Sequence, residues 1–190
     1  AVVEQMYSYE EMFAHTGDNK WAERLEVLGF NALPATLSED MWTHQYVQQV
    51  NQIACQKTMI MAPWSTNGPY AHTFGLEPHF GCCTANFNQG WPKLALSAFM
   101  HSGDTVISSL MLPCVLKADG LTIRLETDYP FNNKMHYSID TDKDFKFVIR
   151  IPSFAKNLKV NGEAAHTKDI ELAIKKGTAE VEIEFETAPY

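Results

Sequence analysis

The chain has 190 residues, of which 45% are hydrophobic and 20% are charged, and its formal net charge is −8. This composition is typical of a folded globular protein with enough residues for one large or two small hydrophobic cores. The acidic balance, without a run of Lys or Arg, argues against nucleic acid and against an anionic membrane surface as partners. A neutral or small ligand is therefore easier to accommodate. No apolar stretch is long enough for a transmembrane helix.

The start of the chain carries no sign of a signal peptide, because AVVEQMYSYEEMF lacks a basic start followed by an apolar run. The chain also begins without Met and inside an amphipathic pattern, which predicts a native N-terminus further upstream. Four cysteines in a chain of this length do not make a disulfide framework. We therefore expect reduced thiols or metal ligands.

Two helices are predicted at the beginning of the chain. Apolar residues recur at helical spacing in VVEQMYSYEEMF, which predicts a helix over residues 1–15. Gly17 is suited to end this helix, and Asp18 is suited to cap the next one. The apolar face of the second helix is expected to run towards Phe30 and to stop before Pro34.

The middle of the chain has a less regular pattern. Residues 36–80 are predicted to form a long loop region with short extended pieces at HQYVQQVNQI and KTMIMAP. A loop of this length usually has a function or wraps around a neighbouring element. Residues 84–100, TANFNQGWPKLALSAFM, are predicted to be helical. We expect an interruption near Gly90 and a restart with Pro92 in the first turn.

Beyond Gly103 the pattern becomes that of β-strands. Short runs with β-patterning are separated by Asp-Gly, Asn-Asn and Asn-Gly turn signals: TVISSLMLPCVL, LTIRLETDYP, KMHYSID, FKFVIRIP, NLKVNG, IELAIKK and AEVEIEFE. In the last run apolar residues alternate with glutamates, as in a strand with one buried face and one wet face. The sequence therefore predicts a domain boundary near residue 103 and an antiparallel β-sandwich over residues 104–190.

Cys82 and Cys83 are adjacent, immediately ahead of the helix predicted in the middle of the chain. A disulfide between them would be strained, because consecutive Cα atoms lie about 3.8 Å apart and ordinary disulfides need at least about 4.4 Å. Two thiols at a bend that leads into a helix can instead turn toward one metal ion, and the free amide N–H groups of a helix start favour the thiolate. Zinc fits sulfur ligands best among the common ions.

The pair by itself leaves several interpretations open. Free cysteines are commonly buried and inert, two ligands do not complete a tetrahedral site, and a nucleophile is a further role. A thiol redox site would predict easy oxidation of Cys82 without a metal. His79 and Glu77 lie close in sequence, although exposure to solvent is the default for each. Cys55 and Cys114 stand in apolar, strand-like contexts and are expected in the core.

Five segments of the sequence carry a resemblance to a known family: VVEQMYSYEEMFAHTGDNKWAERLEVLGFNALPATL, GCCTANFNQGWPK, ETDYPF, FVIRIPSFA and VNGE. With these segments the sequence resembles glycoside hydrolase family 127, the β-L-arabinofuranosidase family, and its close relatives. The segments occur in consistent order over essentially the whole chain, and the CC-x-x-N and RIPS…VNG segments are the most specific. The resemblance implies an α+β multidomain fragment, in which residues 1–103 are the C-terminal helices of a helical (α/α)₆ barrel and residues 104–190 a β-sandwich domain.

The resemblance also implies a chemistry for the cysteine pair. In the family a Zn²⁺ ion is held by three cysteines and a glutamate, and the first cysteine of the adjacent pair is the nucleophile of a retaining mechanism. Carried over, Cys82 is nucleophile and zinc ligand, and Cys83 is a zinc ligand only. Glu26 and Tyr46 are implied as contacts of the sugar. The thiolate would replace the second carboxylate of an ordinary retaining glycosidase, while a general acid is still required.

The family's remaining ligands, a Glu-x-Cys pair, and its acid glutamate would lie upstream of Ala1. We therefore expect the isolated chain to be inactive as a glycosidase. The implied partner is an L-arabinofuranoside-type carbohydrate, a homo-oligomer is compatible with the sequence, and a reduced zinc-thiolate site favours the cytoplasm. The alternative is a non-catalytic, carbohydrate-binding or structural sandwich module with a structural zinc-cysteine site, which keeps four protein ligands.

Overall fold

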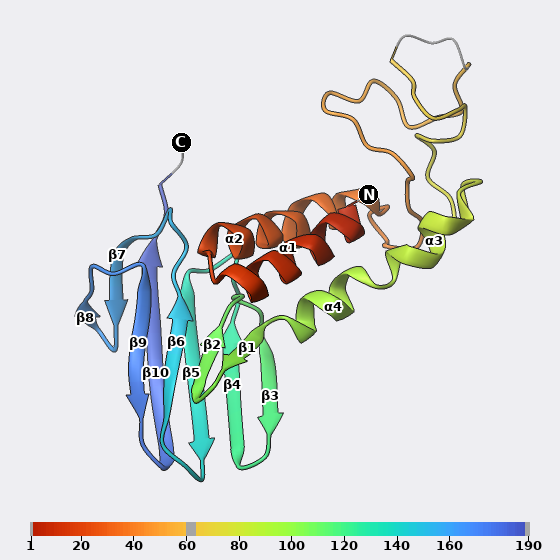
Figure 1. Ribbon diagram of the computed structural model, residues 1–190. Helices are drawn as coiled ribbons and strands as arrows, with labels where there is room; N and C mark the ends of the chain where they lie inside the picture. The colour runs from red at the N-terminus through yellow and green to blue at the C-terminus, as the bar shows by residue number, and fades with distance from the viewer. Residues whose placement is uncertain (1, 60–63, 189–190) are drawn as a thin grey trace. The chain divides into compact units, whose positions relative to one another are not determined.

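The computed structural model describes residues 2–59 and 64–188 and begins with the two predicted helices, α1 (Val2–Thr16) and α2 (Asn19–Val27) (Figure 1). Gly17 has a φ of 62° and donates its N–H to the Phe13 carbonyl at 2.8 Å, which ends α1. The Asp18 Oδ1 accepts a hydrogen bond from the Lys20 N–H at 3.1 Å. The predicted end of the first helix and cap of the second are therefore confirmed.

The helical stretch continues beyond α2, first with wider turns and then with a tighter one. It passes into the π-helical η1 (Leu28–Ala32) and then the 3₁₀-helical η2 (Pro34–Thr36). The change at Leu33 follows from the proline at residue 34, which has no N–H to continue the helical ladder. In the described part of the chain no helix has the length and apolar composition of a membrane span.

The middle of the chain is irregular up to the cysteine pair, as predicted. Two isolated bridges, Leu37 with His44 and His44 with Gly75, are its β-pairing among the described residues. Of the extended pieces expected there, the one at KTMIMAP lies partly outside the described residues. The chain then forms α3 (Gly81–Phe87) and α4 (Gly90–Leu96), so the predicted break before Gly90 is confirmed.

The end of that helical stretch was predicted wrongly. Residues 97–100 were expected to be helical, but strand β1 (Phe99–Ser102) starts there. It forms a hairpin with β2 (Thr105–Ser108) across a turn that contains Gly103, whose φ is 58°. Pairing with β2 satisfies the backbone groups of β1 and outweighs the local helical pattern.

The remaining strands follow the predicted runs closely. They are β3 (Cys114–Ala118), β4 (Leu121–Thr127), β5 (Lys134–Thr141), β6 (Phe145–Arg150), β7 (Lys156–Val160), β8 (Glu163–Ala164), β9 (Asp169–Ile174) and β10 (Gly177–Glu186). They form two sheets, of order β1-β2-β6-β9 and β3-β4-β5-β10-β7-β8. The two sheets share one core, in which residues of both are buried, so the predicted sandwich is confirmed (Figure 1).

The sequence predicted an antiparallel sandwich, but one pair of strands is parallel. β2 pairs with β6 in parallel, with Val106 opposite Phe147. Strands β3, β4 and β5 intervene in the other sheet, so the chain reverses direction four times between β2 and β6. This even number of reversals gives β6 the direction of β2. A crossover between sheets leaves no turn signal that would mark its direction in the sequence.

The core contains the residues that the alternating pattern placed inside. In β10 Val181, Ile183 and Phe185 are buried while the intervening glutamates are exposed or half-buried, as predicted. Across the two sheets, the fully buried Tyr137 ring packs edge-on against Phe147 at 5.4 Å between ring centroids. Its hydroxyl forms a hydrogen bond with the Ser108 Oγ at 2.9 Å, which compensates for its burial.

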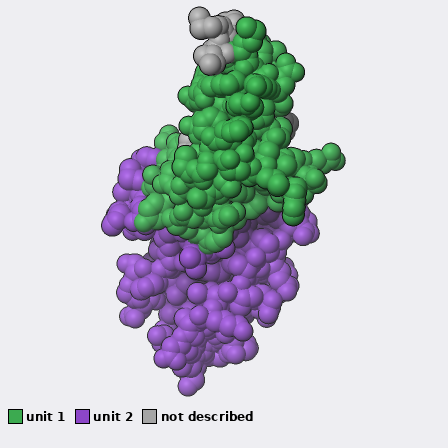
Figure 2. Space-filling view, turned by 90° about the vertical axis from the view of Figure 1, so that its right-hand side faces the viewer, with its two compact units in different colours: residues 1–9, 24–93 green, residues 10–23, 94–190 purple. Residues whose placement is uncertain are grey.

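Residues 1–9 and 24–93 form one compact unit, and residues 10–23 and 94–190 form a second that holds both sheets (Figure 2). Below they are called unit 1 and unit 2. The strands of unit 2 start at Phe99, four residues ahead of the predicted division at residue 103. The assignment of residues 1–103 and 104–190 to two domains stays a prediction.

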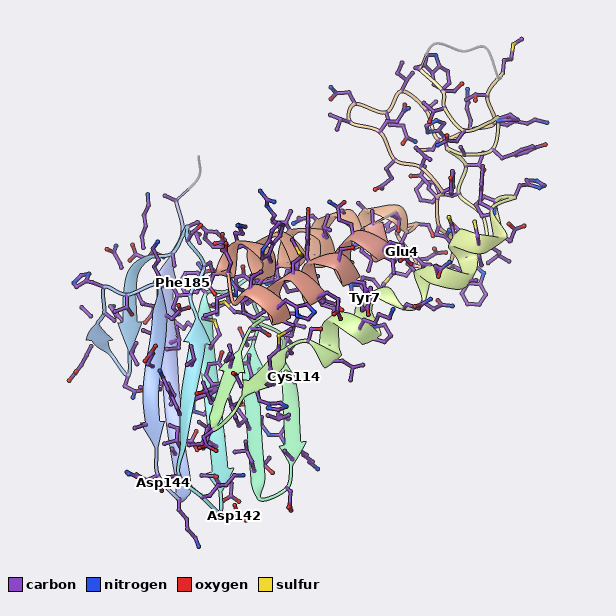
Figure 3. The ribbon with its side chains drawn as sticks, in the orientation of Figure 1. Glu4, Tyr7, Cys114, Asp142, Asp144 and Phe185 are labelled. Carbon is purple, nitrogen blue, oxygen red and sulfur yellow. The ribbon has the colours of Figure 1, made fainter. Side chains whose placement is uncertain are left out.

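Replacing Gly120 by alanine is expected to destabilise the sandwich more than replacing Gly103. Both residues have a positive φ, 68° and 58°, which costs a side chain about 1–2 kcal/mol. At Gly120 an added Cβ would also collide with the Asp142 carboxyl group, which must rotate away, whereas at Gly103 it would meet nothing within 4 Å. Asp142 lies at one end of the sandwich, close to Asp144 (Figure 3).

Urea unfolding of the two variants measures this difference. The double variant Gly120→Ala, Asp142→Ala also removes the carboxyl group. Its loss of stability is expected to be only as large as that of Gly103→Ala. Equal losses in both single variants would contradict the proposed contact with Asp142.

Candidate functional site

Unit 1 contains a pocket of about 330 Å³ that includes the cysteine pair. Its walls come from the start of α1, from the irregular region after η2, and from α3. The lining residues are Val2, Val3, Glu4, Leu33, Thr36, His44, Gln45, Tyr46, Val47, Gln48, Cys82, Cys83, Asn86 and Phe87. None of these lining residues is Lys or Arg, so the pocket suits a neutral polar ligand better than an anion. Glu4 is labelled on α1 in Figure 3.

Cys82 and Cys83 lie in the first turn of α3, with their Sγ atoms 3.8 Å apart. Cys82 is exposed and Cys83 is half-buried, so the interpretation of both as buried, inert residues is wrong for Cys82. The side-chain amide of Asn86 donates to the Cys82 carbonyl at 2.7 Å, and the Gln89 amide donates to the Asn86 Oδ1 at 2.9 Å. A chain of polar contacts thus supports the turn that presents the two thiols.

The helix start does not favour the Cys83 thiolate in the way the sequence suggested. Partial burial raises the pKa of the Cys83 thiol, and the hydrogen bond and charge of Cys82 raise it further. The Cys83 N–H is already bonded to the Phe80 carbonyl at 2.9 Å and is not directed at a thiolate. Without a cation, Cys83 is therefore held in its protonated form.

Alkylation should report this protonation state. In chelator-treated protein we expect iodoacetamide to modify Cys83 and Cys114 more slowly than the exposed Cys55 and Cys82, since burial also raises the pKa of Cys114. The thiolate is the form that reacts. A raised thiol pKa therefore lowers the alkylation rate at neutral pH, and the rate increases only at a higher pH. Peptide mass spectrometry over a pH series measures the four rates; Cys83 reacting as fast as Cys82 at pH 7 would contradict the expectation.

The structure places the two predicted sugar contacts differently. Tyr46 lines the pocket with the cysteines, and its ring stacks on Phe80 at 3.7 Å between centroids. Glu26 lies on α2 and is only 4% exposed, although solvation is the default for a glutamate late in a helix. It is absent from the lining of this pocket, so the structure brings Tyr46 to the cysteine pair but not Glu26.

Several pocket residues were missed by the sequence analysis. His44 and Gln45 are buried and come from the irregular region, where no periodic pattern singles them out. The Gln45 side chain donates to the His72 carbonyl at 2.9 Å. Asn86 had a signal, because it is the last residue of the CC-x-x-N segment. Glu4 looked like an ordinary residue on the polar face of α1.

The cysteine pair supplies two sulfur atoms for a metal ion, fewer than a tetrahedral site needs. Among residues 2–59 and 64–188, no group of three or more His, Cys, Asp or Glu side chains could hold an ion. His79 and Glu77 do not line the pocket. Cys55 is exposed and Cys114 only half-buried, so the expectation of two core cysteines is wrong, since the structure leaves their strand-like segments at the surface or at a strand end.

Comparisons with known proteins bear on both units. Residues 105–185 match the family model described as "Beta-L-arabinofuranosidase, GH127 middle domain". No curated protein matches the chain. A solved structure titled "Glycoside hydrolase" superposes with a TM-score of 0.76 and 21% sequence identity, over 97% of this chain and 32% of its own.

Two further solved structures are titled as GH127 enzymes. A GH127 beta-L-arabinofuranosidase from Geobacillus stearothermophilus T6 is 17% identical, and another GH127 beta-arabinofuranosidase is 24% identical. Each has a TM-score of 0.69 and covers 97% of this chain and 31% of its own length. The chain thus spans about a third of the length of these structures and shares the fold of that part.

Proposed function

We propose that this partial GH127 chain supplies the nucleophile and two of the zinc ligands of a retaining glycoside hydrolase that cleaves β-L-arabinofuranosides or related sugars. The resemblance to GH127 is confirmed by the family match over residues 105–185. One observation carries the proposal further: two adjacent cysteines open together into a pocket that can hold one sugar ring. The match lies in the sandwich, whereas the pocket lies in unit 1, so the two are independent.

The spacing of the two sulfur atoms supports a zinc ion. Two thiolates bound at about 2.3 Å to a tetrahedral zinc ion lie about 3.8 Å apart. The Sγ atoms of Cys82 and Cys83 are 3.8 Å apart without any rearrangement. When bound, the ion would keep both thiols deprotonated at neutral pH, which offsets the raised pKa of Cys83.

Cys82 is the better nucleophile of the two because it is the exposed one. Its thiolate would form a bond from Sγ to the anomeric carbon while the glycosidic C–O bond breaks and a general acid protonates the leaving oxygen. Water would then displace Sγ from the same carbon while the conjugate base of the general acid takes its proton, which releases the sugar with its original configuration and restores both the thiolate and the acid. Cys83 is half-buried and would remain a ligand throughout.

The other polar groups of the pocket suit a sugar. The Tyr46 hydroxyl, the Gln48 amide and the Asn86 amide can exchange hydrogen bonds with hydroxyl groups of a neutral furanose. Glu4 provides a carboxylate at the same pocket. Glu26 remains a proposed sugar contact from the resemblance alone.

The rest of the active site is proposed to lie in the longer protein. We infer that residues 1–103 are the last helices of an (α/α)₆ barrel and residues 104–190 its β-sandwich. This division rests on the resemblance, and the match of the chain to about a third of the length of each solved structure agrees with a part of a longer protein. The general acid and two further zinc ligands would then come from outside this chain, and the chain by itself would be inactive.

Turnover of a β-L-arabinofuranoside by the full-length protein tests the proposal. The peptide that contains Cys82 should carry one covalently bound sugar after rapid acid quenching. Zinc bound by four protein ligands with no sugar adduct and no turnover would instead indicate a structural zinc site beside a non-catalytic sandwich.

A further inference from the structure

Helix α3 carries the cysteine pair but cannot fix its own position. It has seven residues, and its N-cap residue Phe80 forms no side-chain capping hydrogen bond. A helix this short is unstable in isolation, because nucleation costs more than so few hydrogen bonds return. The direction of the two thiols must therefore come from residues that pack against α3.

His44 makes two contacts with α3 from the irregular region. Its Nε2 lies 3.2 Å from the Thr84 Oγ1, within hydrogen-bonding distance, and its ring stacks on Phe87 at 5.4 Å with 7° between the planes. Thr84 follows the cysteine pair directly, and Thr84 and Phe87 are three residues apart on one helix face. One side chain thus holds α3 at two points and opposes both its rotation and its tilt.

His44 is itself firmly placed. It is only 8% exposed, and its backbone pairs with Gly75 in both directions, with N···O distances of 3.1 and 3.2 Å. A second bridge joins His44 to Leu37, next to η2. Its ring is consequently a fixed reference against which α3 is oriented, and it lies in the lining of the pocket.

We propose that His44 is a positioning residue that orients α3 so that Cys82 and Cys83 point together into the pocket. This proposal rests on the proposed function, in which both sulfur atoms bind one metal ion. His44 acts through Thr84 and Phe87 and needs no contact with the sugar or the metal. Residues that orient metal ligands from behind typically contribute 10-fold to 100-fold in metal affinity.

Two variants separate the parts of the contact. His44→Phe keeps an aromatic ring for stacking on Phe87 but removes the nitrogen, and Thr84→Val removes the hydroxyl. Thr73→Val is the matched control, because the Thr73 hydroxyl also bonds a neighbour, the Tyr70 carbonyl at 2.7 Å, but lies outside the pocket lining and α3.

The test is the affinity of the full-length protein for Co²⁺, followed by the thiolate-to-metal absorption band in competition with a chelator. We expect His44→Phe and Thr84→Val each to weaken Co²⁺ binding about 10-fold, and Thr73→Val to bind Co²⁺ like the parent protein. The double variant His44→Phe, Thr84→Val should bind Co²⁺ as well as either single variant, because both changes remove the same contact. Unchanged affinity in His44→Phe and Thr84→Val would overturn the proposal. A loss that tracks a lowered melting temperature would overturn it too, since His44 would then be structural only.

A second measurement separates this proposal from the proposed function. If the parent protein binds no Co²⁺ at the pair, the zinc-dependent function fails, and metal-free alkylation still tests His44. The ratio of Cys82 to Cys83 modification should fall toward one in His44→Ala, because α3 loses its orientation. An unchanged ratio in a folded His44→Ala variant would show that His44 does not position the pair.

Discussion

Under the proposed function, in which Cys82 is the nucleophile, replacing Cys82 by serine in the full-length protein is expected to lower kcat on a β-L-arabinofuranoside by at least about 10³-fold, the scale on which enzymes lose activity without their nucleophile. The serine hydroxyl is nearly the same size but is a far weaker nucleophile at neutral pH. The pocket that includes Cys82 should stay intact, because the residue is exposed and its carbonyl, not its side chain, receives the Asn86 amide. KM is therefore expected to change much less than kcat.

Steady-state kinetics measure kcat and KM of the variant, and peptide mass spectrometry measures whether the peptide that contains residue 82 still carries a bound sugar. Cys55→Ser is the matched control, since Cys55 is also exposed but lies outside the pocket lining, and its variant should keep full activity. Because both cysteines are proposed zinc ligands, Cys82→Ser and Cys83→Ser should each bind zinc more weakly as well as lose activity. Turnover by Cys82→Ser close to that of the parent protein would place the nucleophile elsewhere.

Replacing Phe147 by alanine is expected to lower the free energy of unfolding of the sandwich by about 3–5 kcal/mol. The ring is fully buried and lies between Tyr137 of the other sheet and Phe145 of its own strand, at 5.4 and 6.1 Å between centroids. Removing it leaves a cavity between the sheets that neither neighbour can fill without leaving its own rotamer. Both sheets should lose stability together.

Urea unfolding of the 190-residue chain, followed by circular dichroism in the strand region, measures the loss. Phe131→Ala is the matched control, because that ring is 95% exposed and its removal should change stability by no more than about 0.5 kcal/mol. Similar losses in both variants would mean that the two sheets do not share the core described above.

The sequence determined the elements of this protein where the local pattern and the tertiary environment agree. The glutamates of β10 alternate with apolar residues, and that period of two suffices to place Val181, Ile183 and Phe185 in a core. Gly17 and Asp18 marked a helix end and a helix start, because their conformational preferences act within a few residues. The adjacent cysteines could be recognised as chemically unusual for the same local reason.

Only the tertiary structure decided the features that depend on distant residues. The parallel pairing of β2 with β6 follows from strands that cross to the other sheet, and β1 replaced a predicted helical end because β2 was available as a partner. The side chain of His44, a residue of the irregular region, contacts Thr84 and Phe87 of α3. Tyr46 lines the same pocket as the cysteine pair. Periodicity reports which face of an element is buried, but not which residues far apart in the chain cover that face, because the latter depends on how the whole chain packs.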